Sequence, residues 1–340
     1  MAHNPLGAWK VDAADWPREG SVEGKLRFLV RYAILAPSGH NTQPWLFRVR
    51  DGRLEVIADR LRALPVVDPH DRALVISCGA AVAMARATLR GLGHAGGVAL
   101  LPEPGDPDVM ARIGLGPERA PDAGDRSRCA AIVRRRTTRR KFADEPLPVG
   151  LAARIAAAAE AEGVEALLVT EPERKAAVAA LVAEGDRAQF SDPAFRRELG
   201  TWVHPRRTGD GLSGAAFGMP DALSAVGGLV IRTFDMGGGI AAKDEEIATA
   251  SPALLVIATK GDEPPDWLAA GMAHADILLE VTAAGWTAAY LNQPVEVERL
   301  RPLLRERAGC RGVPQLLLRI GRGPKIDPAA RRPVEEVLVE

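Results

Sequence analysis

Aromatic residues, cysteines and net charge are all scarce in this sequence. Phe, Trp and Tyr make up 4% of the 340 residues, and 44 Lys and Arg residues balance 44 Asp and Glu residues. A balanced chain has no global field to hold a polyanion or an anionic membrane, so any anion site must be local. The three cysteines, Cys78, Cys129 and Cys310, are far apart and odd in number. They form no disulfide framework, which favours a reducing compartment.

Long hydrophobic runs are missing as well. The first twenty residues lack an apolar core of signal-peptide length, and no run reaches the ~18 residues of a membrane span. We therefore expect a cytoplasmic protein that does not use a membrane. The hydrophobic fraction of 47% and the charged fraction of 26% are typical of a globular protein. The length suits roughly two domains.

The common motifs of metal and nucleophile chemistry do not occur. The six histidines include no pair at i, i+3 or i+4, and neither H-E-x-x-H nor G-x-S-x-G is present. We assign no metal ligand and no catalytic side chain. The segment "GLGHAG", Gly91 to Gly96, has the G-x-G-x-x-G spelling but follows a helix and precedes a strand. Phosphate binding needs the reverse order, so we interpret it as a helix stop.

Hydrophobic periodicity predicts the order of helices and strands. Leu26, Leu29 and Val30 begin an i, i+3, i+4 pattern that predicts a helix over 22–36. Asp51 and Gly52 separate "WLFRVR" from "RLEVIAD" and predict a tight hairpin turn. Further helices are predicted over about 73–93, 149–163 and 267–284 and from about 171, and further strands over 96–102, 164–170, 252–259, 286–291, 314–321 and at a possible edge near 337–339.

The composition changes along the chain predict two halves. Residues 102–128 are rich in Pro, Gly, Asp and Arg and indicate a long surface connection. We divide the chain into an N-terminal extension (1–20), a first half (21–130) and a second half (131–340) with a C-terminal extension. A glycine-rich segment over about 207–246 shows no sustained periodicity and predicts a long mobile loop or lid.

The segment "PSGHNTQPW", Pro37 to Trp45, carries more hydrogen-bonding groups than a turn requires. One interpretation is a proline-stopped helix followed by a well-capped turn. The other is a ligand loop, in which Ser38, Asn41 and Gln43 present donors and acceptors to a planar polar molecule. The flat faces of Trp45 and Phe47 would then lie beside that molecule.

Two arginine-rich segments also have two interpretations each. "RRRTTRRK", Arg134 to Lys141, is either a solvated face or a phosphate clamp, because guanidinium groups bind phosphate oxygens bidentately. Nucleic-acid binding is disfavoured by the zero net charge and the lack of interleaved aromatic residues. "RRPVEE", Arg331 to Glu336, would be interpreted as a solvated tail if it stood alone.

Taken together, three segments resemble motifs of the nitroreductase-like FMN flavoprotein family. "APSGHNTQPWLF" resembles P-S-x-x-N-x-Q-P-W-x-F, "RRTTRRKFADEPLP" resembles R-x-S-x-R-x-F-x-D-x-P-x-P, and "ARRPVEEVLVE" resembles a closing R-R-P-L-E-E-V. The loop motif precedes the arginine motif in this chain. This order resembles that of the fused, Acg-like branch of the family. That resemblance implies an α+β, nitroreductase-like fold. Its two related halves, each a mainly antiparallel sheet flanked by helices, are fused as a pseudo-dimer.

The resemblance also implies a site for one FMN between the halves. The first half lacks the arginine motif, and "AAAAEAEGVEALLV" takes the place of the loop motif in the second half, so only one site keeps its parts. The implied cofactor-binding residues are Pro37, Ser38, Gly39, Asn41, Gln43, Pro44, Trp45, Leu46 and Phe47 at the ring, and Arg136, Thr138, Arg140, Arg331 and Arg332 at the phosphate. The region from Gly285 to Tyr290 matches a ring-supporting segment only loosely.

The function implied is an FMN-dependent oxidoreductase. It would pass hydride from NAD(P)H through FMN to a nitroaromatic, a quinone or a similar small planar acceptor. The alternative is a flavin-binding or flavin-sequestering protein with little turnover, because the lid segment can cover the flavin. We expect no nucleic-acid partner. The fused halves predict a monomer with internal pseudo-two-fold symmetry, and a dimer is left open.

Overall fold

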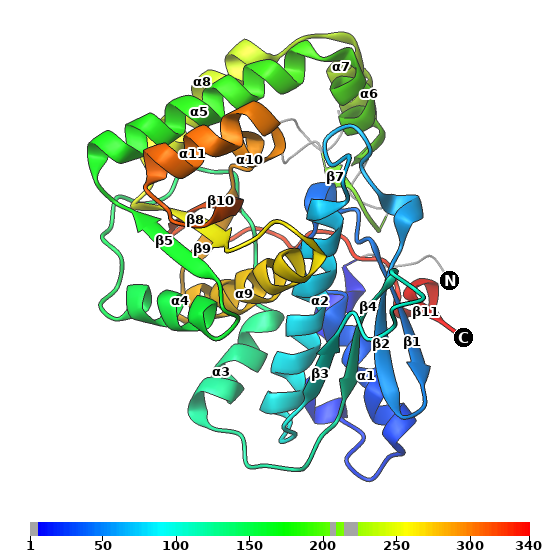
Figure 1. The fold of residues 1–340 in the computed structure, drawn as a ribbon. Coiled ribbons are helices and arrows are strands. Elements are labelled where there is room, and N and C mark those ends of the chain that lie inside the picture. Colours follow the sequence, from blue (N-terminus) through cyan, green and yellow to red (C-terminus); the bar gives the residue numbers. More distant parts are fainter. Residues whose placement is uncertain (1–5, 205–208, 214–223) are drawn as a thin grey trace.

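A computed structural model describes residues 6–204, 209–213 and 224–340 of the chain (Figure 1). The strands are β1 (Trp45–Arg50), β2 (Arg53–Ala58), β3 (Gly97–Leu100), β4 (Val109–Gly114), β5 (Glu165–Val169), β6 (Val203–His204), β7 (Leu212–Ser213), β8 (Ala253–Thr259), β9 (Thr287–Tyr290), β10 (Val313–Gly321) and β11 (Leu338–Val339). The helices are α1 (Val22–Ala33), α2 (Arg72–Gly91), α3 (Ala123–Ile132), α4 (Leu151–Glu160), α5 (Pro172–Ser191), α6 (Pro193–Thr201), α7 (Ser224–Thr233), α8 (Gly237–Thr249), α9 (Pro264–Ala283), α10 (Gln293–Glu296), α11 (Arg301–Ala308) and α12 (Val334–Val337).

The strands form two larger sheets, one in each half. The first sheet has the order β11-β1-β2-β4-β3 and the second has the order β5-β8-β10-β9. Apart from the parallel pair of β1 and β11, the neighbouring strands in both sheets are antiparallel. Helices flank each sheet in Figure 1. The predicted fold class, α+β with two mainly antiparallel sheets in one chain, is confirmed.

The hairpin of β1 and β2 matches its prediction closely. The two strands pair from Trp45 opposite Ala58 to Arg50 opposite Arg53. Asp51 and Gly52 have φ angles of 49° and 66°, as a two-residue turn with two left-handed positions requires. Aspartate and glycine tolerate that conformation, so the local sequence sets the register between β1 and β2.

One strand of the first sheet was missed. Residues 102–128 were predicted to be a surface connection, but β4 lies within them and pairs with both β2 and β3. Its side chains are buried except for the half-buried Arg112. The prediction is wrong because the apolar run is only six residues long and is flanked by Pro and Gly on both sides. The burial of β4 comes from its neighbours and not from a strong local pattern.

Helices α2 and α9 form the seam between the halves. A Cβ atom placed on Gly79 of α2 would lie 2.4 Å from the Leu268 carbonyl oxygen, and one placed on Gly271 of α9 would lie 2.0 Å from the Ile76 carbonyl oxygen. Glycine at these two positions therefore lets the helix backbones touch. The α2 sequence is long and apolar enough to cross a membrane, but 94% of that window is buried inside the protein. We therefore interpret α2 as a core helix.

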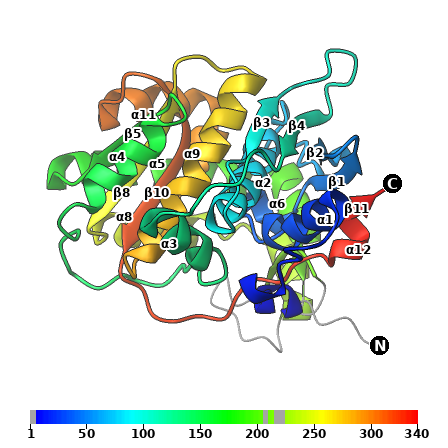
Figure 2. The ribbon, with the colours of Figure 1, turned by 90° about the horizontal axis from the view of Figure 1, so that it is seen from below.

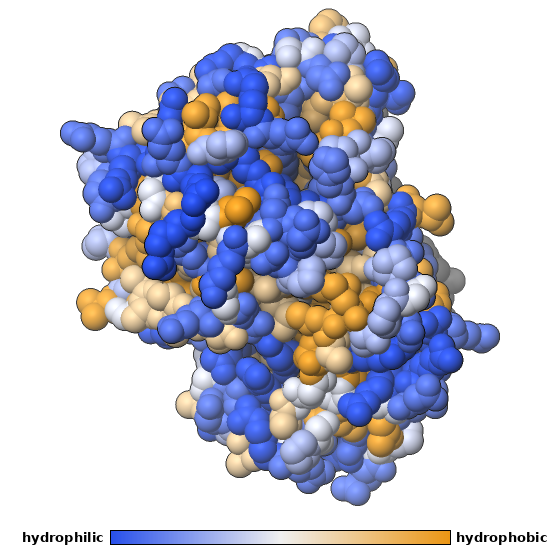
Figure 3. Space-filling model, viewed as in Figure 1, coloured by the Kyte–Doolittle hydropathy of each residue, from blue (hydrophilic) through white to orange (hydrophobic). Residues whose placement is uncertain are grey.

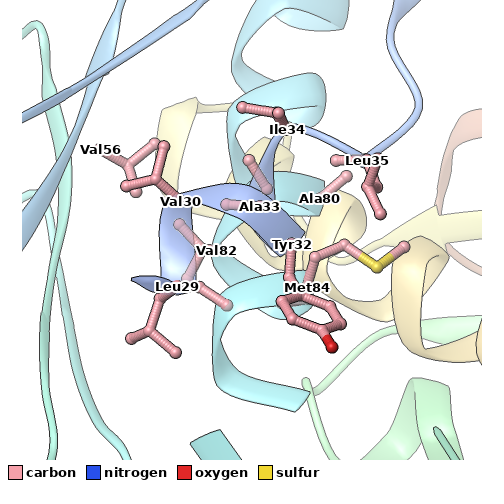
Figure 4. Close-up of a cluster of buried hydrophobic side chains, with 14 of the residues drawn as sticks. Leu29, Val30, Tyr32, Ala33, Ile34, Leu35, Val56, Ala80, Val82 and Met84 are labelled. Carbon is pink, nitrogen blue, oxygen red and sulfur yellow. The ribbon is translucent and has the colours of Figure 1, made fainter. Parts of the chain in front are cut away.

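Side chains of α1 and α2 build the core of the first half. Figure 4 shows Leu29, Val30 and Ala33 from α1 close to Val82 and Met84 from α2. All five are fully buried. The predicted helix over 22–36 is confirmed as α1, although it ends at Ala33. This packing holds the segment that follows α1 against the body of the protein.

The glycine-rich segment is partly helical, which corrects the predicted loop over 207–246. The helix α7 and most of α8 lie within it, whereas residues 205–208 and 214–223 lie outside the described part of the chain. Glycine at the start of α8 masked the helical pattern. A Cβ atom on Gly237 would lie 2.9 Å from the Phe190 Cβ of α5, so this glycine serves close packing of two helices.

The C-terminal segment returns from the second half to the first. Figure 2 shows it leaving β10, passing along the lower side of the molecule and ending as β11 beside β1. The register places Phe47 opposite Leu338 and Arg48 opposite Val339. The predicted edge strand is confirmed for Leu338 and Val339. This return carries Arg331 and Arg332 to the segment between α1 and β1.

The predicted boundary between the halves, at residues 130 and 131, falls inside α3 and stays a prediction.

Polar and charged side chains cover most of the face in Figure 3, and hydrophobic side chains appear there in small groups. The three cysteines are buried and free.

Candidate functional site

The loop between α1 and β1 has a constrained backbone. His40, Asn41 and Gln43 have φ angles of 46°, 56° and 52°. Such left-handed angles are uncommon outside glycine, and several together cost free energy that the surroundings must supply. The Gln43 backbone N–H donates to the Ser38 hydroxyl oxygen at 2.9 Å, which closes the loop on itself. This strain distinguishes the loop from a simple turn.

The side-chain amides of the loop are buried and bonded to two distant segments. Asn41 Nδ2 donates to the carbonyl oxygens of Gly211 at 3.0 Å and of Ala330 at 3.2 Å. Gln43 Nε2 donates to the Gly209 carbonyl oxygen at 2.9 Å, and Gln43 Oε1 accepts from the Arg332 backbone N–H at 2.8 Å. The predicted cradle groups therefore hold the glycine-rich segment and the C-terminal segment together.

The described strip Gly209–Ser213, which we name the cover, lies on this loop. The Gly211 N–H donates to the Asn41 carbonyl oxygen at 3.2 Å, and Asp210 pairs with Arg62. Gly211 has a φ of 69°, and a Cβ atom there would lie 2.5 Å from the Trp202 carbonyl oxygen. Glycine at this position therefore lets the cover approach the loop closely. Within the described residues, this part of the predicted loop contacts Asn41 and Gln43, and its role as a lid stays a prediction.

Three arginines gather beside the loop around one indole ring. The guanidinium carbons of Arg135, Arg136 and Arg331 lie 5.8, 4.5 and 4.9 Å from the centroid of the Trp9 ring. Arg135 and Arg331 both donate to the Leu35 carbonyl oxygen, at 3.0 and 3.3 Å. We name these three residues the arginine cluster. Their like charges repel one another across a small volume.

The arginine cluster is short of negative charge. Arg331 is 2% exposed and donates to the Asn41 side-chain oxygen at 2.9 Å and to backbone carbonyl oxygens. Burial, followed by Arg135, lowers the pKa of Arg331 well below its ordinary value. Burial also lowers the pKa values of Arg135 and Arg136, and Asp327 opposes this for Arg136. The buried Nε atoms of Arg135 and Arg331 have no hydrogen-bond partner. An oxyanion with several acceptor oxygens would satisfy these donors.

The other predicted phosphate residues have different surroundings. Arg332 stabilises the loop conformation, because its guanidinium donates to the Gln43 carbonyl oxygen at 3.0 Å and pairs with Asp59 at 3.2 Å. Thr138 is buried and accepts from the Arg140 backbone N–H at 3.2 Å. The Arg140 side chain is exposed. Arg136 and Arg331 are therefore brought together, whereas the Arg140 side chain is not part of the cluster.

The predicted aromatic wall of the site needs correction. Trp45 and Phe47 are fully buried and belong to the core of the first half. Alternate residues of a strand point to one face, and the inward face of β1 is occupied by these two rings. Neither ring is free to lie flat against a ligand in this structure. Leu46, on the opposite face, is half-buried, and Pro37 and Pro44 are buried.

Sequence reasoning missed Arg319. This residue of β10 is fully buried, and its guanidinium carbon lies 4.0 Å from the centroid of the Phe142 ring. It donates to the carbonyl oxygens of Thr138 and Arg140 at 3.1 and 2.9 Å, which fixes the arginine motif on the second sheet. Its Nε and NH1 atoms are buried without a partner. The available signal was one arginine inside the apolar strand "PQLLLRIG".

Tyr290 and His274 form a second pair that was missed. The Tyr290 hydroxyl lies 3.0 Å from His274 Nε2. Burial and Arg135 lower the pKa of His274 to about 3, and burial raises the pKa of Tyr290 to about 12 against the opposing charges of Arg135 and Arg331. The imidazole is therefore neutral and the phenol keeps its proton at neutral pH. The pair adds a hydroxyl near the arginine cluster.

Other candidate features lie elsewhere. Hollows of about 330 and 420 Å³ on the surface are lined by other residues, mostly charged, and neither contains a predicted site residue. Among residues 6–204, 209–213 and 224–340, no group of three or more His, Cys, Asp or Glu side chains is placed to hold a metal ion.

Comparisons with solved structures give distant likenesses. An FMN and NADPH-dependent nitroreductase, NfnB, from Sphigopyxis sp. is 23% identical, with a TM-score of 0.43, over 63% of this chain and 98% of its own. A nitroreductase with bound FMN from Desulfitobacterium hafniense is 12% identical, with a TM-score of 0.38, over 62% of this chain and 96% of its own. With TM-scores this low, the family assignment rests on sequence relatives.

The sequence relatives match nearly the whole chain. Rv3131 of Mycobacterium tuberculosis, which carries the provisional name NAD(P)H nitroreductase, is 33% identical over 92% of this chain and 90% of its own length. Acg of the same organism, with the same provisional name, is 28% identical over 92% of this chain and 94% of its own length. No family model matches the chain. On the strength of these relatives, the chain belongs to the nitroreductase-like family, in the branch that contains Rv3131 and Acg.

Proposed function

We propose that the chain binds one FMN between its halves and acts as an NAD(P)H-dependent oxidoreductase. The observation that carries this proposal is the arginine cluster, which lies beside a strained loop of buried amides. FMN joins a phosphate to a planar ring that has a hydrogen-bonding edge. Its phosphate suits three guanidinium groups, and its ring edge suits the Asn41 amide once the Gly211 carbonyl oxygen of the cover has moved away from that amide.

The buried unpartnered donors support the fit to FMN. A phosphate offers several acceptor oxygens to the Nε atoms of Arg135 and Arg331, and its charge offsets the repulsion within the cluster. The Tyr290 hydroxyl is a further donor of the kind that a phosphate or ring carbonyl accepts. The provisional name of the sequence relatives Rv3131 and Acg, NAD(P)H nitroreductase, agrees with a nicotinamide donor.

Each residue has a separate task in the proposed site. Arg136 and Arg331 hold the phosphate, Asn41 orients the ring edge, and Arg332 keeps the loop in shape through Gln43 and Asp59. When bound, FMN supplies a ring that accepts and releases hydride, so no catalytic side chain is required. The cover keeps water from the loop. We propose a nitroaromatic, a quinone or a similar flat molecule as acceptor, bound in turn with the nicotinamide donor.

The cover favours a second candidate function. Hydrogen bonds from Asn41, Gln43 and Gly211 hold the cover on the loop. A nicotinamide or an acceptor must lie against the ring, and the cover must move for that to happen. If it moves rarely, the protein binds and sequesters flavin with little turnover.

Flavin spectra of the purified protein separate these possibilities. We expect a visible flavin spectrum, present as purified or restored by added FMN, and bleaching by NADH or NADPH under anaerobic conditions. If NADH or NADPH bleaches the flavin but neither a quinone nor a nitroaromatic reoxidises it, the acceptor belongs to another class of compound. Flavin that stays oxidised with either nicotinamide would favour sequestration. Protein that takes up no FMN would falsify the cofactor assignment.

A further inference from the structure

Helices α5, α8 and α10 meet at a polar junction outside the arginine cluster. A Cβ atom on Gly185 of α5 would lie 2.6 Å from the Gln293 Cβ of α10, so the two backbones are in contact. The Gln293 amide nitrogen donates to Asp186 Oδ1 of α5 at 2.9 Å and to Asp244 Oδ2 of α8 at 3.1 Å. One amide therefore joins three helices through two carboxyl groups.

Two acceptor atoms of this junction lack donors. Asp186 is 2% exposed, and both Asp186 Oδ2 and Gln293 Oε1 are buried without a hydrogen-bond partner. Buried acceptors without donors cost free energy. The two atoms belong to residues that are already bonded to each other. A single proton on Asp186 Oδ2 can donate to Gln293 Oε1 and so satisfy both, in a carboxylic acid–carboxamide pair.

The charges around Asp186 favour that proton. Burial, followed by Asp244, raises the pKa of Asp186 to about 7, and Glu296 of α10 acts in the same direction. Arg139 and the Gln293 hydrogen bond oppose this rise. Burial also raises the pKa of Asp244. The charged groups that act on Asp244 in the opposite direction are Arg139, Arg319 of β10 and Lys243 of α8.

We propose that Asp186 is a proton-dependent clasp between α5, α8 and α10. With its proton, Asp186 forms the closed pair with Gln293, and the same amide holds Asp244. Without the proton, the Asp186 and Asp244 carboxylates both accept from the Gln293 amide and repel each other where they are buried. The contact between α8 and α5 therefore loosens. The proton leaves to water as the pH rises and returns as it falls.

The clasp bears on the cover. The helix α8 packs on α5, α5 contacts α6, and α6 contacts β6, the strand that pairs with β7 of the cover. A loosened α8 lets α5 and α6 shift, so the cover on Asn41 and Gln43 is easier to lift. We then expect flavin to exchange faster, and this expectation rests on the proposed function. The clasp itself does not, because its proton and helices can be followed without added flavin.

Hydrogen exchange of the full chain at pH 6 and pH 8, corrected for intrinsic rates, tests the clasp. A proton lost with a pKa near 7 when closed and near 4 when open makes opening about tenfold easier between these pH values. We expect the protection of α8 amides to fall about tenfold. Asp186→Asn mimics the protonated acid and should abolish this change, whereas Glu245→Gln, at an exposed carboxylate of α8, should keep it.

The opposite results overturn the proposal. Protection of α8 that is equal at both pH values in the wild-type protein would do so, as would a pH dependence that persists in Asp186→Asn. If that variant does not fold, the 13C NMR titration of the Asp186 carboxyl in the wild-type protein decides. A midpoint near 4 overturns the clasp. Flavin release measured in parallel should speed up about tenfold from pH 6 to pH 8, and unchanged release would remove only the link to the cover.

Discussion

Arg331 is a buried cation whose hydrogen-bond partners are neutral. Its guanidinium donates to an amide oxygen and to backbone carbonyl oxygens, and it lies over the Trp9 ring. Removing a charge from water costs several kcal/mol, and neutral acceptors repay only part of that. We therefore expect an anion to bind at this point, whichever ligand carries it.

We expect Arg331→Ala to weaken FMN binding by about 10-fold to 150-fold, because a charge-assisted hydrogen bond contributes about 1.5–3 kcal/mol. Riboflavin lacks the phosphate, so its affinity should change much less. Titration by flavin fluorescence measures both. Arg140→Ala, at an exposed arginine of the same motif region, is the matched control and should bind FMN normally. Equal losses for FMN and riboflavin would argue against a phosphate role for Arg331.

Inorganic phosphate should stabilise the protein freed of flavin. At about 100 times its Kd, a ligand that binds only the folded state adds about 2.7 kcal/mol to the free energy of unfolding. Thermal unfolding with phosphate, against chloride at equal ionic strength, measures this. The stabilisation should be reduced in Arg331→Ala and retained in Arg140→Ala. A similar rise in Tm in all three proteins would point to a general salt effect.

The sequence motifs predicted Arg136 and Arg331 but not the full arginine cluster. Arg135 is adjacent to a motif position and was passed over, because a pattern of alternate residues carries no information on which arginine turns inward. Arg319 is separated from the motif by about 180 residues and reaches it only through the pairing of β9 and β10. Such neighbours depend on sheet topology, which local sequence patterns do not report.

At the scale of elements, the cover is a short strip held by a few bonds. Its strand β7 pairs with β6 over two residues only, in parallel. The Asn41 and Gln43 side-chain amides supply further bonds, and Arg62 pairs with Asp210. Short segments with few buried apolar contacts open at low free-energy cost. We therefore expect the cover to open at a lower free-energy cost than the loop that it covers.

We expect Gly211→Ala to raise the rate of FMN association. The φ of 69° and the 2.5 Å approach to the Trp202 carbonyl oxygen make a Cβ atom costly there, by about 1–3 kcal/mol. The cover should lift about 5-fold to 150-fold more readily, as stopped-flow fluorescence of FMN would record. Gly239→Ala is the control, because a Cβ atom there meets nothing within 4 Å. An unchanged rate in a folded Gly211→Ala protein would contradict a gating role.

Most strands and the helices α1, α2, α4, α5 and α9 could be predicted from the sequence, whereas α3, α6 and α11 could not. The β1–β2 hairpin and α1 have strong local patterns and were predicted closely. The strand β4 and the helices α7 and α8 were not, because glycine and proline dominate their surroundings. Their structure depends on packing against β2 and β3 for β4, α6 for α7 and α5 for α8, so tertiary contacts outweigh local propensity there.

At the scale of the molecule, the two halves are joined along a seam that has no room for side chains at its crossing point. Gly79 and Gly271 face each other there. The seam also carries charge, because Arg86 of α2 pairs with Glu162 and with Asp276 of α9 at 2.5 and 2.7 Å. The relative position of the halves, and with it the spacing of the loop and the arginine motif, depends on this crossing.

Gly271→Ala should lower the free energy of unfolding by about 1–3 kcal/mol or more, since its Cβ atom would lie 2.0 Å from the Ile76 carbonyl oxygen and the helices must separate. Calorimetry measures the fall in Tm. Gly239→Ala, an unobstructed helical position, should be neutral or slightly stabilising. A Gly271→Ala protein as stable as this control would show that the seam can widen without cost.

The pairing of β11 with β1 also determines how long β1 lacks its parallel neighbour during synthesis. The ribosome completes β1 at Arg50, but its parallel neighbour begins only at Leu338. At about 5–20 residues per second, roughly 15–60 s pass between the two. During that interval the outer edge of β1 is open to pairing with other chains. Arg331 is synthesised only about a second before Leu338 at this rate, so we expect the nascent chain to complete the proposed anion site and to cover this strand edge almost simultaneously.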